Sequence, residues 1–288
     1  MEPHSSMKTG LFVTDLDGTL FTDEKTLSGK DWQTLTRLRE KGVVTAIATG
    51  RSFFSFSRAM DQIRVEIKDL PVDYLIFSTG AGLMSLPDET VIEKHSLQGS
   101  DVKRICAYFD EAGFDYMVHR AIPDTPYFLY KSHGRDNPDF RTRIRLYREF
   151  AAPLNSQATL YESATEVLAV VPGKMNTLFL DRIRSDLSGF SVIHATSPLD
   201  HSSSWIEVFD KQVSKSLAAQ RLTDRLRIRR ERVAAVGNDY NDQDLLAWAG
   251  SGFLTANGAG DLQSCFTIVG SNNESGVSQA AEQAGFLE

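Results

Sequence analysis

Residues 11–20 read LFVTDLDGTL, and the rest of the chain is organised around them. The run from Leu11 to Val13 is apolar and β-prone and stops at a polar turn, so it predicts a short buried strand. Asp15 and Asp17 follow at the carboxyl end of that strand, the edge of an open α/β sheet where ligands bind. Because residues i and i+2 of a strand project to the same side, we expect both carboxylates to face one reacting group.

Two carboxylates at one sheet edge can bind a hard cation. Mg²⁺ prefers oxygen ligands and keeps several waters, so one carboxylate can bind it and also act as a nucleophile, while the other moves protons. Gly18 then lets the backbone turn away without a Cβ clash. The alternative is that Asp15 and Asp17 only end a strand and cap the next segment. The whole string is more specific than the pair alone, because it resembles the first motif of the haloacid dehalogenase (HAD) superfamily.

The bulk properties are those of a globular protein. The chain has 288 residues, of which 41% are hydrophobic and 24% charged, enough for two domains of ordinary size. A net charge of -7 argues against a general nucleic-acid partner. The polar residues 1–8 lack the apolar core of a signal peptide, and no apolar run approaches membrane-spanning length. We therefore expect a cytoplasmic monomer or small homo-oligomer with no membrane partner.

The two cysteines, Cys106 and Cys265, are far apart in the sequence, so neither a disulfide framework nor a zinc site is expected. Both lie in apolar surroundings, and we interpret them as small buried hydrophobic residues in a reducing compartment.

An alternation of strands and helices follows the first strand. Residues 43–48 and 74–77 are short apolar runs that predict buried strands, and residues 26–41 and 53–67 have the periodicity of helices. This order is typical of a parallel sheet with right-handed crossovers. The fold class predicted here is therefore α/β, with a three-layer Rossmann-like parallel sheet as its core.

The pattern changes at Met84. Hairpin signals and mixed strands and helices continue to Thr196, which predicts an inserted α+β domain over residues 84–196. Four arginines of this insertion fall in one predicted helix, and we interpret them as a solvated face rather than a nucleic-acid site: Arg141, Arg143, Arg145 and Arg148. The α/β alternation resumes at Trp205, so residues 1–83 and 197–288 are expected to form the core domain.

Two further positions suit phosphate chemistry. Thr49 and Gly50 close the strand 43–48, where a hydroxyl and free amides can hold phosphate oxygens, although a threonine there is also an ordinary helix cap. Lys215 opens a predicted helix at residues 214–226, where the macrodipole disfavours a cation. That position favours a working role for the lysine, with plain solvent exposure as the alternative.

The last strand of the pattern, residues 233–236, ends in the polar loop 237–242, which reads GNDYND. Such a loop between a strand and a helix is again a site at the sheet edge, with a capped helix start as the alternative.

Four segments of the chain, in order, resemble the four HAD motifs of Cof-type (subclass IIB) phosphatases. They are residues 11–20, the Thr-Gly-Arg at 49–51, the Val-Ser-Lys at 213–215 and the loop 237–242. Ser216 stands where these proteins usually have glycine, and Asn238 where they usually have an acid. The insertion between the second and third motifs matches the position of a type II (C2B-like) cap.

This resemblance implies roles for the site residues. Asp15 attacks phosphorus and forms an aspartyl-phosphate, and Asp17 acts as acid and then as base. Phosphate oxygens are held by Thr49, Gly50, Lys215 and Asn241. Mg²⁺ is held by Asp15, the backbone carbonyl of Asp17, Asn238 and Asp242, with Asp239 as a nearby alternative.

The predicted function is Mg²⁺-dependent hydrolysis of a small phosphorylated metabolite, with a sugar phosphate as the favoured class. A phosphomutase of the same fold needs the same two aspartates and stays an alternative. A non-catalytic phosphosugar-binding regulator is the other, and Asn238 is its one support.

Overall fold

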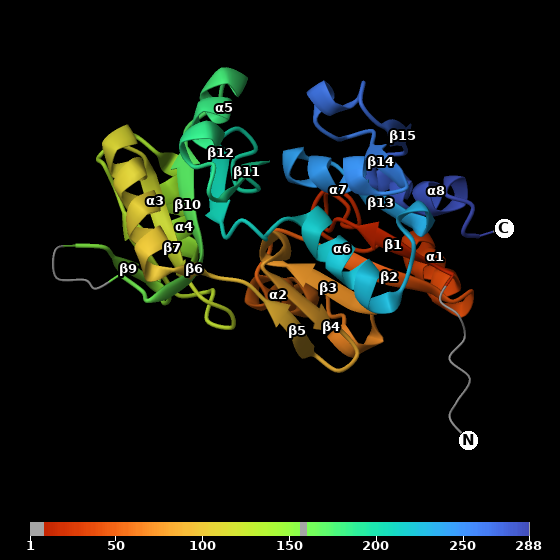
Figure 1. Cartoon of the computed structure of the whole chain (residues 1–288). Coiled ribbons are helices and arrows are strands. Elements are labelled where there is room, and N and C mark those ends of the chain that lie inside the picture. The colour runs from red at the N-terminus through yellow and green to blue at the C-terminus, as the bar shows by residue number, and fades with distance from the viewer. Residues whose placement is uncertain (1–8, 156–159, 288) are drawn as a thin grey trace. The chain divides into compact units, whose positions relative to one another are not determined.

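A computed structural model describes residues 9–155 and 160–287, which fall into two compact units (Figure 1). Unit 1 comprises Met1–Arg51, Phe56–Glu93 and Ser214–Glu288, and unit 2 comprises Ser52–Ser55 and Lys94–Val213. The α/β class predicted from the sequence is confirmed, with two sheets. Residues 1–8, on which the absence of a signal peptide was predicted, lie outside the described part of the chain.

Unit 1 contains an eight-stranded sheet in the order β15-β14-β13-β1-β2-β3-β4-β5. The pairs that join β15 through to β3 are parallel, and β4 pairs with β3 antiparallel. The strands are β1 (Gly10–Thr14), β2 (Val43–Ala48), β3 (Tyr74–Phe77), β4 (Gly82–Ser85), β5 (Thr90–Lys94), β13 (Val233–Gly237), β14 (Ser251–Thr255) and β15 (Thr267–Val269).

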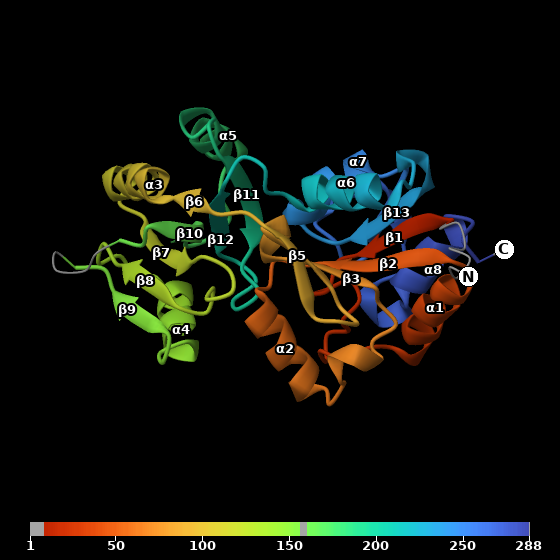
Figure 2. The same cartoon turned by 60° about the horizontal axis from the view of Figure 1, so that its bottom comes forward.

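Helices cover both faces of this sheet, as Figure 2 shows, with α6 and α7 on one side and α1 and α8 on the other. The helices of unit 1 are α1 (Gly29–Glu40), α6 (Lys215–Leu226), α7 (Gln243–Trp248), α8 (Gly276–Gln283) and, from Phe56 onward, α2 (Phe53–Gln62). Leu11 and Val13 of β1 are fully buried in the core that α6 and α7 share with the sheet. The strand is buried on both faces, as a central parallel strand requires.

Local signals account for several element boundaries. Ser28 is the N-cap of α1, because its side chain accepts a hydrogen bond from the N–H of Asp31. The helix predicted over residues 53–67 ends earlier, at Gln62, and a short 3₁₀ turn follows at Ile67–Asp69. The strands β14 and β15 had no counterpart in the sequence prediction, because the polar and small residues around them hide a short apolar run.

Unit 2 contains a second, seven-stranded sheet in the order β11-β12-β10-β7-β8-β9, with β6 paired to β10. Its strands are β6 (Leu97–Gln98), β7 (Asp115–Arg120), β8 (Phe128–Lys131), β9 (Ala151–Pro153), β10 (Ser163–Val171), β11 (Ser191–Thr196) and β12 (Ser204–Phe209). One face packs on α3 (Gly99–Ala112) and α5 (Thr177–Asp186), and the other on α4 (Pro138–Leu146).

The strands next to the predicted domain limits, Met84 and Thr196, do not all belong to the same sheet. The hairpin β4–β5, which begins near Met84, joins the sheet of unit 1, whereas β12, which contains Trp205, lies between β10 and β11 in the sheet of unit 2. The division of the chain into a catalytic core and a cap over residues 84–196 stays a prediction.

Two expectations about single side chains were wrong. Cys106 is buried as expected, but Cys265 is exposed. Arg143 does not lie on a solvated helix face: its guanidinium stacks 4.4 Å from the ring centroid of Trp205, and its Nη2 lies 3.5 Å from Nε2 of His119. The ring of Trp205 gives the planar guanidinium a stacking partner beside the helix. Among the described helices, none combines the length and apolar character that crossing a membrane would need.

Candidate active site

The site segments begin where neighbouring parallel strands end. β1 lies between β2 and β13, and the residues that follow these strands are Asp15, Thr49 and Asn238. Helix α6 begins nearby at Lys215, after the N-cap Ser214, whose hydroxyl accepts a hydrogen bond from an N–H of the first turn. Because parallel strands place their carboxyl ends at one edge, residues from distant parts of the sequence meet there.

Lys215 joins two carboxylates inside this edge. Its Nζ donates a hydrogen bond of 2.7 Å to Oδ1 of Asp15 and one of 2.6 Å to Oδ1 of Asp242. Lys215 and Asp242 are fully buried, and Asp15 is 5% exposed. Buried charges require such partners, so the lysine has a working position rather than a solvated one, and the alternative of solvent exposure is excluded.

Burial and the neighbouring charges together set the pKa values of Asp15 and Lys215. Burial raises the pKa of Asp15 to about 7, with the negative charge of Asp242 adding to the rise and Lys215 opposing it. Burial alone would lower the pKa of Lys215, but the two carboxylates raise it well above the ordinary value. The lysine is therefore a permanent cation that neutralises the acids beside it.

Asp242 also shapes the loop after β13. Its second oxygen, Oδ2, accepts hydrogen bonds from the N–H groups of Asn238 at 2.9 Å and Asp239 at 3.1 Å. A Cβ on Gly237 would lie 2.5 Å from Cγ of Asp242, so only glycine lets the carboxylate approach the strand end so closely.

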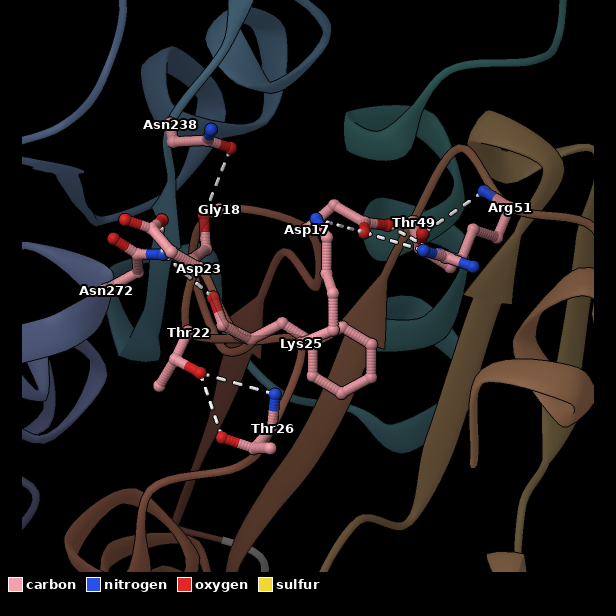
Figure 3. Close-up of polar contacts among 12 residues, drawn as sticks. Asp17, Gly18, Thr22, Asp23, Lys25, Thr26, Thr49, Arg51, Asn238 and Asn272 are labelled. Carbon is pink, nitrogen blue, oxygen red and sulfur yellow. Dashed lines mark hydrogen bonds and ion pairs between the residues drawn. The ribbon is translucent and has the colours of Figure 1, made fainter. Parts of the chain in front are cut away.

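Asp17 lies in a turn beyond the end of β1, and it pairs with different cations from Asp15 (Figure 3). Arg51 donates from Nε to Oδ2 at 2.5 Å and from Nη2 to Oδ1 at 2.8 Å, and Nζ of Lys25 lies 3.5 Å from Oδ1. Burial alone would raise the pKa of Asp17, but the hydrogen bonds and charge of Arg51, helped by Lys25, lower it below the ordinary value. Both aspartates follow the last residue of β1, Thr14, so the expectation that their carboxylates face one reacting group stays a prediction.

The end of β2 supplies hydroxyl and amide groups. Thr49 is 1% exposed, and its Oγ1 accepts a hydrogen bond from the N–H of Arg51 at 3.1 Å. Asn241 lies beside it, since its Nδ2 is 3.7 Å from the place of a Cβ on Gly50. The buried Thr79, from the turn after β3, lies 3.6 Å from the same place. The segments after β2, β3 and β13 thus converge at Gly50.

Asn238 faces the turn that carries Asp17. Its Oδ1 accepts a hydrogen bond of 3.2 Å from Oγ1 of Thr19, and a Cβ on Gly18 would lie 2.5 Å from its Nδ2. Gly18 has a φ of 76°, which favours glycine, so both space and backbone conformation require that residue. Asp239 has another task, because its side chain accepts a hydrogen bond from the N–H of Asp242 in a reciprocal capping box.

The atoms that could bind a metal ion at this edge of the sheet are oxygens. Asp15, the backbone carbonyl of Asp17 and the amide oxygen of Asn238 fit a hard cation that keeps several waters, such as Mg²⁺. Within residues 9–155 and 160–287, no group of three or more His, Cys, Asp and Glu side chains is arranged to hold a metal ion. The acids near the edge are instead joined to Lys215 and Arg51, so a cation has to share them with these two side chains.

The unusual Ser216 fits the first turn of α6. Its N–H and its hydroxyl both donate to Oδ2 of Asp244, at 3.2 and 2.6 Å, and its hydroxyl lies 2.9 Å from that of Ser214. Asp244 belongs to α7, so these bonds tie the starts of two helices together and keep Lys215 in place.

Several contributors were missed at the level of sequence. Arg51 was identified only as part of a motif, and Lys25 was not considered at all. For Arg51 there was a usable signal, because a cationic residue soon after a predicted strand can reach the carboxylates that follow the neighbouring strand. For Lys25 there was none, because nothing in the sequence indicates that it folds back on Asp17 across eight residues. Asn257 and Asn272 also reach the turn after β1.

Comparison with known proteins identifies the family. The profile of the haloacid dehalogenase-like hydrolases matches residues 12–280. A 5-amino-6-(5-phospho-D-ribitylamino)uracil phosphatase of Bacillus subtilis is 28% identical over 282 residues, which cover 94% of this chain and 96% of that protein.

Solved structures show the same fold. A phosphatase of the haloalkanoate (HAD) superfamily from Bacteroides thetaiotaomicron superposes with a TM-score of 0.74 at 20% identity, covering 99% of this chain and 98% of the other. A HAD subclass IIB sugar phosphatase superposes with a TM-score of 0.73 at 18% identity, covering 96% of this chain and 100% of the other.

Proposed function

The chain belongs to the haloacid dehalogenase-like hydrolases, and on that premise we propose that it is a Mg²⁺-dependent phosphatase that forms an aspartyl-phosphate on Asp15. The observation that carries this proposal is the position of Asp15, buried at the end of the central strand and hydrogen-bonded to Lys215. A phosphate monoester repels nucleophiles by its own charge, so an attacking carboxylate needs cations beside it.

Each residue then has a task. Asp15 attacks phosphorus, and the P–O bond to the leaving alcohol breaks while Asp17 gives its proton to that oxygen. Asp17 next takes a proton from water, which attacks the aspartyl-phosphate and releases inorganic phosphate and Asp15. Lys215, Thr49 and the N–H groups near Gly50, with Asn241, hold the phosphoryl oxygens throughout.

Asp15, the carbonyl of Asp17, Asn238 and Asp242 are the proposed magnesium ligands or their close support. The ion supplies charge neutralisation and orients the phosphoryl group. Asp242 acts mainly by holding the N–H of Asn238 and the ammonium of Lys215, as its hydrogen bonds indicate.

The proposed substrate is a small phosphorylated metabolite, with a sugar phosphate as the favoured class. The relative that acts on a phosphorylated ribitylamino compound and the structurally similar sugar phosphatase both support this choice. Residues 84–196 are proposed to act as the cap that selects the leaving group and excludes water.

Release of phosphate from p-nitrophenyl phosphate, with Mg²⁺ and with EDTA, tests the proposal. We expect turnover only with Mg²⁺, and none in Asp15→Asn. Asp224→Asn is the matched control, because it makes the same change at an exposed position on α6. Turnover in Asp15→Asn close to that of the control would refute the mechanism, and an isomerised phosphosugar without free phosphate would identify a phosphomutase instead.

A further inference from the structure

The turn after β1 is held by donors from the far end of the sequence. The carbonyl of Leu16 accepts a hydrogen bond from the N–H of Phe21 within the turn. The carbonyl of Gly18 instead accepts from Nδ2 of Asn257 at 2.8 Å, and that of Phe21 accepts from Nδ2 of Asn272 at 3.0 Å. Two asparagines thus satisfy backbone carbonyls on both sides of the loop that follows Asp17.

The two asparagines are joined to each other. The N–H of Asn272 donates to Oδ1 of Asn257 at 3.0 Å, which fixes the orientation of the Asn257 amide and directs its Nδ2 toward Gly18. The second bond of the Asn272 amide nitrogen goes to Oδ1 of Asp23 at 3.0 Å, so both of its hydrogens are used (Figure 3).

Asn272 is 1% exposed, yet its Oδ1 has no hydrogen-bond partner among the described residues. A buried acceptor without a partner is unfavourable, so packing alone does not explain an asparagine there. Its two N–H donors, which are directed at the turn, do explain it.

The segment around Asn257 holds a second part of the site. The N–H of Ala259 donates to the carbonyl of Asn238 at 2.8 Å. A Cβ on Gly258 would lie 3.0 Å from the same carbonyl oxygen and closer still to Leu254, so the segment is packed tightly against the loop after β13. The backbones of Gly18 and Asn238, which border the proposed cation site, are therefore held by two residues of one short segment, Asn257 and Ala259.

Gly18 is where this support is most needed. A glycine allows both adjoining peptide groups to rotate, and one of them carries the carbonyl of Asp17. The hydrogen bond from Asn257 to the Gly18 carbonyl fixes the peptide group on the other side of Gly18, between Gly18 and Thr19, and so limits how far the glycine can move the Asp17 carbonyl. We propose that Asn257 and Asn272 are positioning residues that fix the Asp17–Gly18 backbone so that it can bind the metal and the phosphoryl group; this inference rests on the function proposed above.

The test compares Asn257→Asp, Asn257→Ala and Asn272→Ala with Asn273→Ala. Asn257→Ala removes the donor to Gly18 without adding a charge, whereas Asn257→Asp keeps the acceptor for the N–H of Asn272 but replaces the donor with a negatively charged oxygen. Asn273→Ala is the matched control, because its side chain bonds to Asp23, from Nδ2 to Oδ2 at 2.8 Å and with Oδ1 accepting from the N–H at 3.1 Å, rather than to the carbonyls of Gly18 and Phe21. Mg²⁺ binding to each free protein is measured by isothermal titration calorimetry, the melting temperature is measured in EDTA, and kcat and KM are measured with p-nitrophenyl phosphate.

We expect Mg²⁺ affinity and kcat to fall by at least about fivefold in Asn257→Ala, the factor that loss of one hydrogen bond gives, and the added charge of Asn257→Asp to offset part of the loss of Mg²⁺ affinity. KM and the melting temperature in EDTA should stay close to those of the control. A lower melting temperature with unchanged Mg²⁺ affinity and kcat would show a merely structural role and overturn the inference.

The two proposals fail in different ways. If the unaltered protein releases no phosphate and binds no Mg²⁺, the function proposed above is wrong and the positioning role falls with it. If the unaltered protein is active and Asn257→Ala matches Asn273→Ala in Mg²⁺ affinity and kcat, only the positioning role is wrong.

Discussion

Arg51 donates hydrogen bonds to both carboxylate oxygens of Asp17, from Nε to Oδ2 at 2.5 Å and from Nη2 to Oδ1 at 2.8 Å. A side chain proposed to donate a proton is thus held in its ionised form by a bidentate pair. Proton donation becomes possible only when this pair loosens.

Replacing Arg51 should therefore move the pH dependence of the first chemical step. The arginine lowers the pKa of Asp17, so Arg51→Ala raises it and keeps the acid protonated to higher pH. We expect the alkaline limb of the kcat/KM profile to shift to higher pH. Lys25→Ala should shift it less, because Lys25 lies 3.5 Å away and its side chain is 51% exposed. An unchanged limb in Arg51→Ala would show that Asp17 is not the proton donor.

The two aspartates should fail at different steps. Asp15→Asn removes the nucleophile, so turnover should fall by more than about a thousandfold, as in other loss-of-nucleophile variants. Asp17→Asn should be nearly as inactive but accumulate phosphoenzyme, because activation of the hydrolytic water is lost. Intact-mass spectrometry after brief exposure to substrate measures this intermediate, and its accumulation in Asp15→Asn would exclude Asp15 as the attacking group.

Variants of the loop after β13 should differ in the Mg²⁺ concentration that they need for half-maximal activity. Asn238→Asp adds a charge at the cation site and should lower the Mg²⁺ concentration for half-maximal activity. Asp242→Ala should raise it strongly and destabilise the fold by about 3–5 kcal/mol, because Lys215 loses one of its two buried partners.

Asp239→Ala is the comparison for that series. It loses a capping interaction of about 1 kcal/mol, with little change in Mg²⁺ requirement, because the Asp239 side chain caps the turn. Mg²⁺ titrations of the initial rate separate these variants. A larger effect for Asp239→Ala than for Asp242→Ala would identify Asp239 as the ligand.

The stability of the folded protein should also depend on pH through a buried glutamate in unit 2. Burial, and then the neighbouring Glu207, raise the pKa of Glu166 to about 8 from an ordinary 4.5. The folded state therefore binds the extra proton between these values, and the stability of the wild-type protein falls as pH rises from about 4.5 to about 8. Glu166→Gln removes this slope, so its advantage in melting temperature should grow with pH over that range. Glu149→Gln, at an exposed position of unit 2, is the control, and equal slopes in both variants would contradict the assignment.

The sequence was most informative where one short stretch contained both the local pattern and the chemistry. The strand ending at Asp15 and the helix beginning at Lys215 follow from apolar runs and a serine cap, and both residues can be identified without their partners. The contact between them spans 200 positions, and only the strand order of the sheet brings them together.

The sequence concealed side chains whose role depends on a neighbour. Arg143 of the helix α4 was interpreted by its charge alone, but Trp205 of the strand β12 gives it a stacking partner. Asn257 and Asn272 are ordinary polar loop residues until their donors are seen to meet the turn after β1. The strands β14 and β15 are short and lie in polar surroundings, so no periodicity marked them.

The place of β1 at the centre of its sheet has a consequence for biosynthesis. β1 leaves the ribosome long before its neighbour β13, since Thr19 and Asn238, which follow these strands, are 219 positions apart. Until β13 emerges, β1 has one open edge, which is a template for pairing with other chains. The nascent protein therefore depends on protection of that edge during translation, and a chain truncated before β13 is expected to aggregate rather than to remain as a partial enzyme.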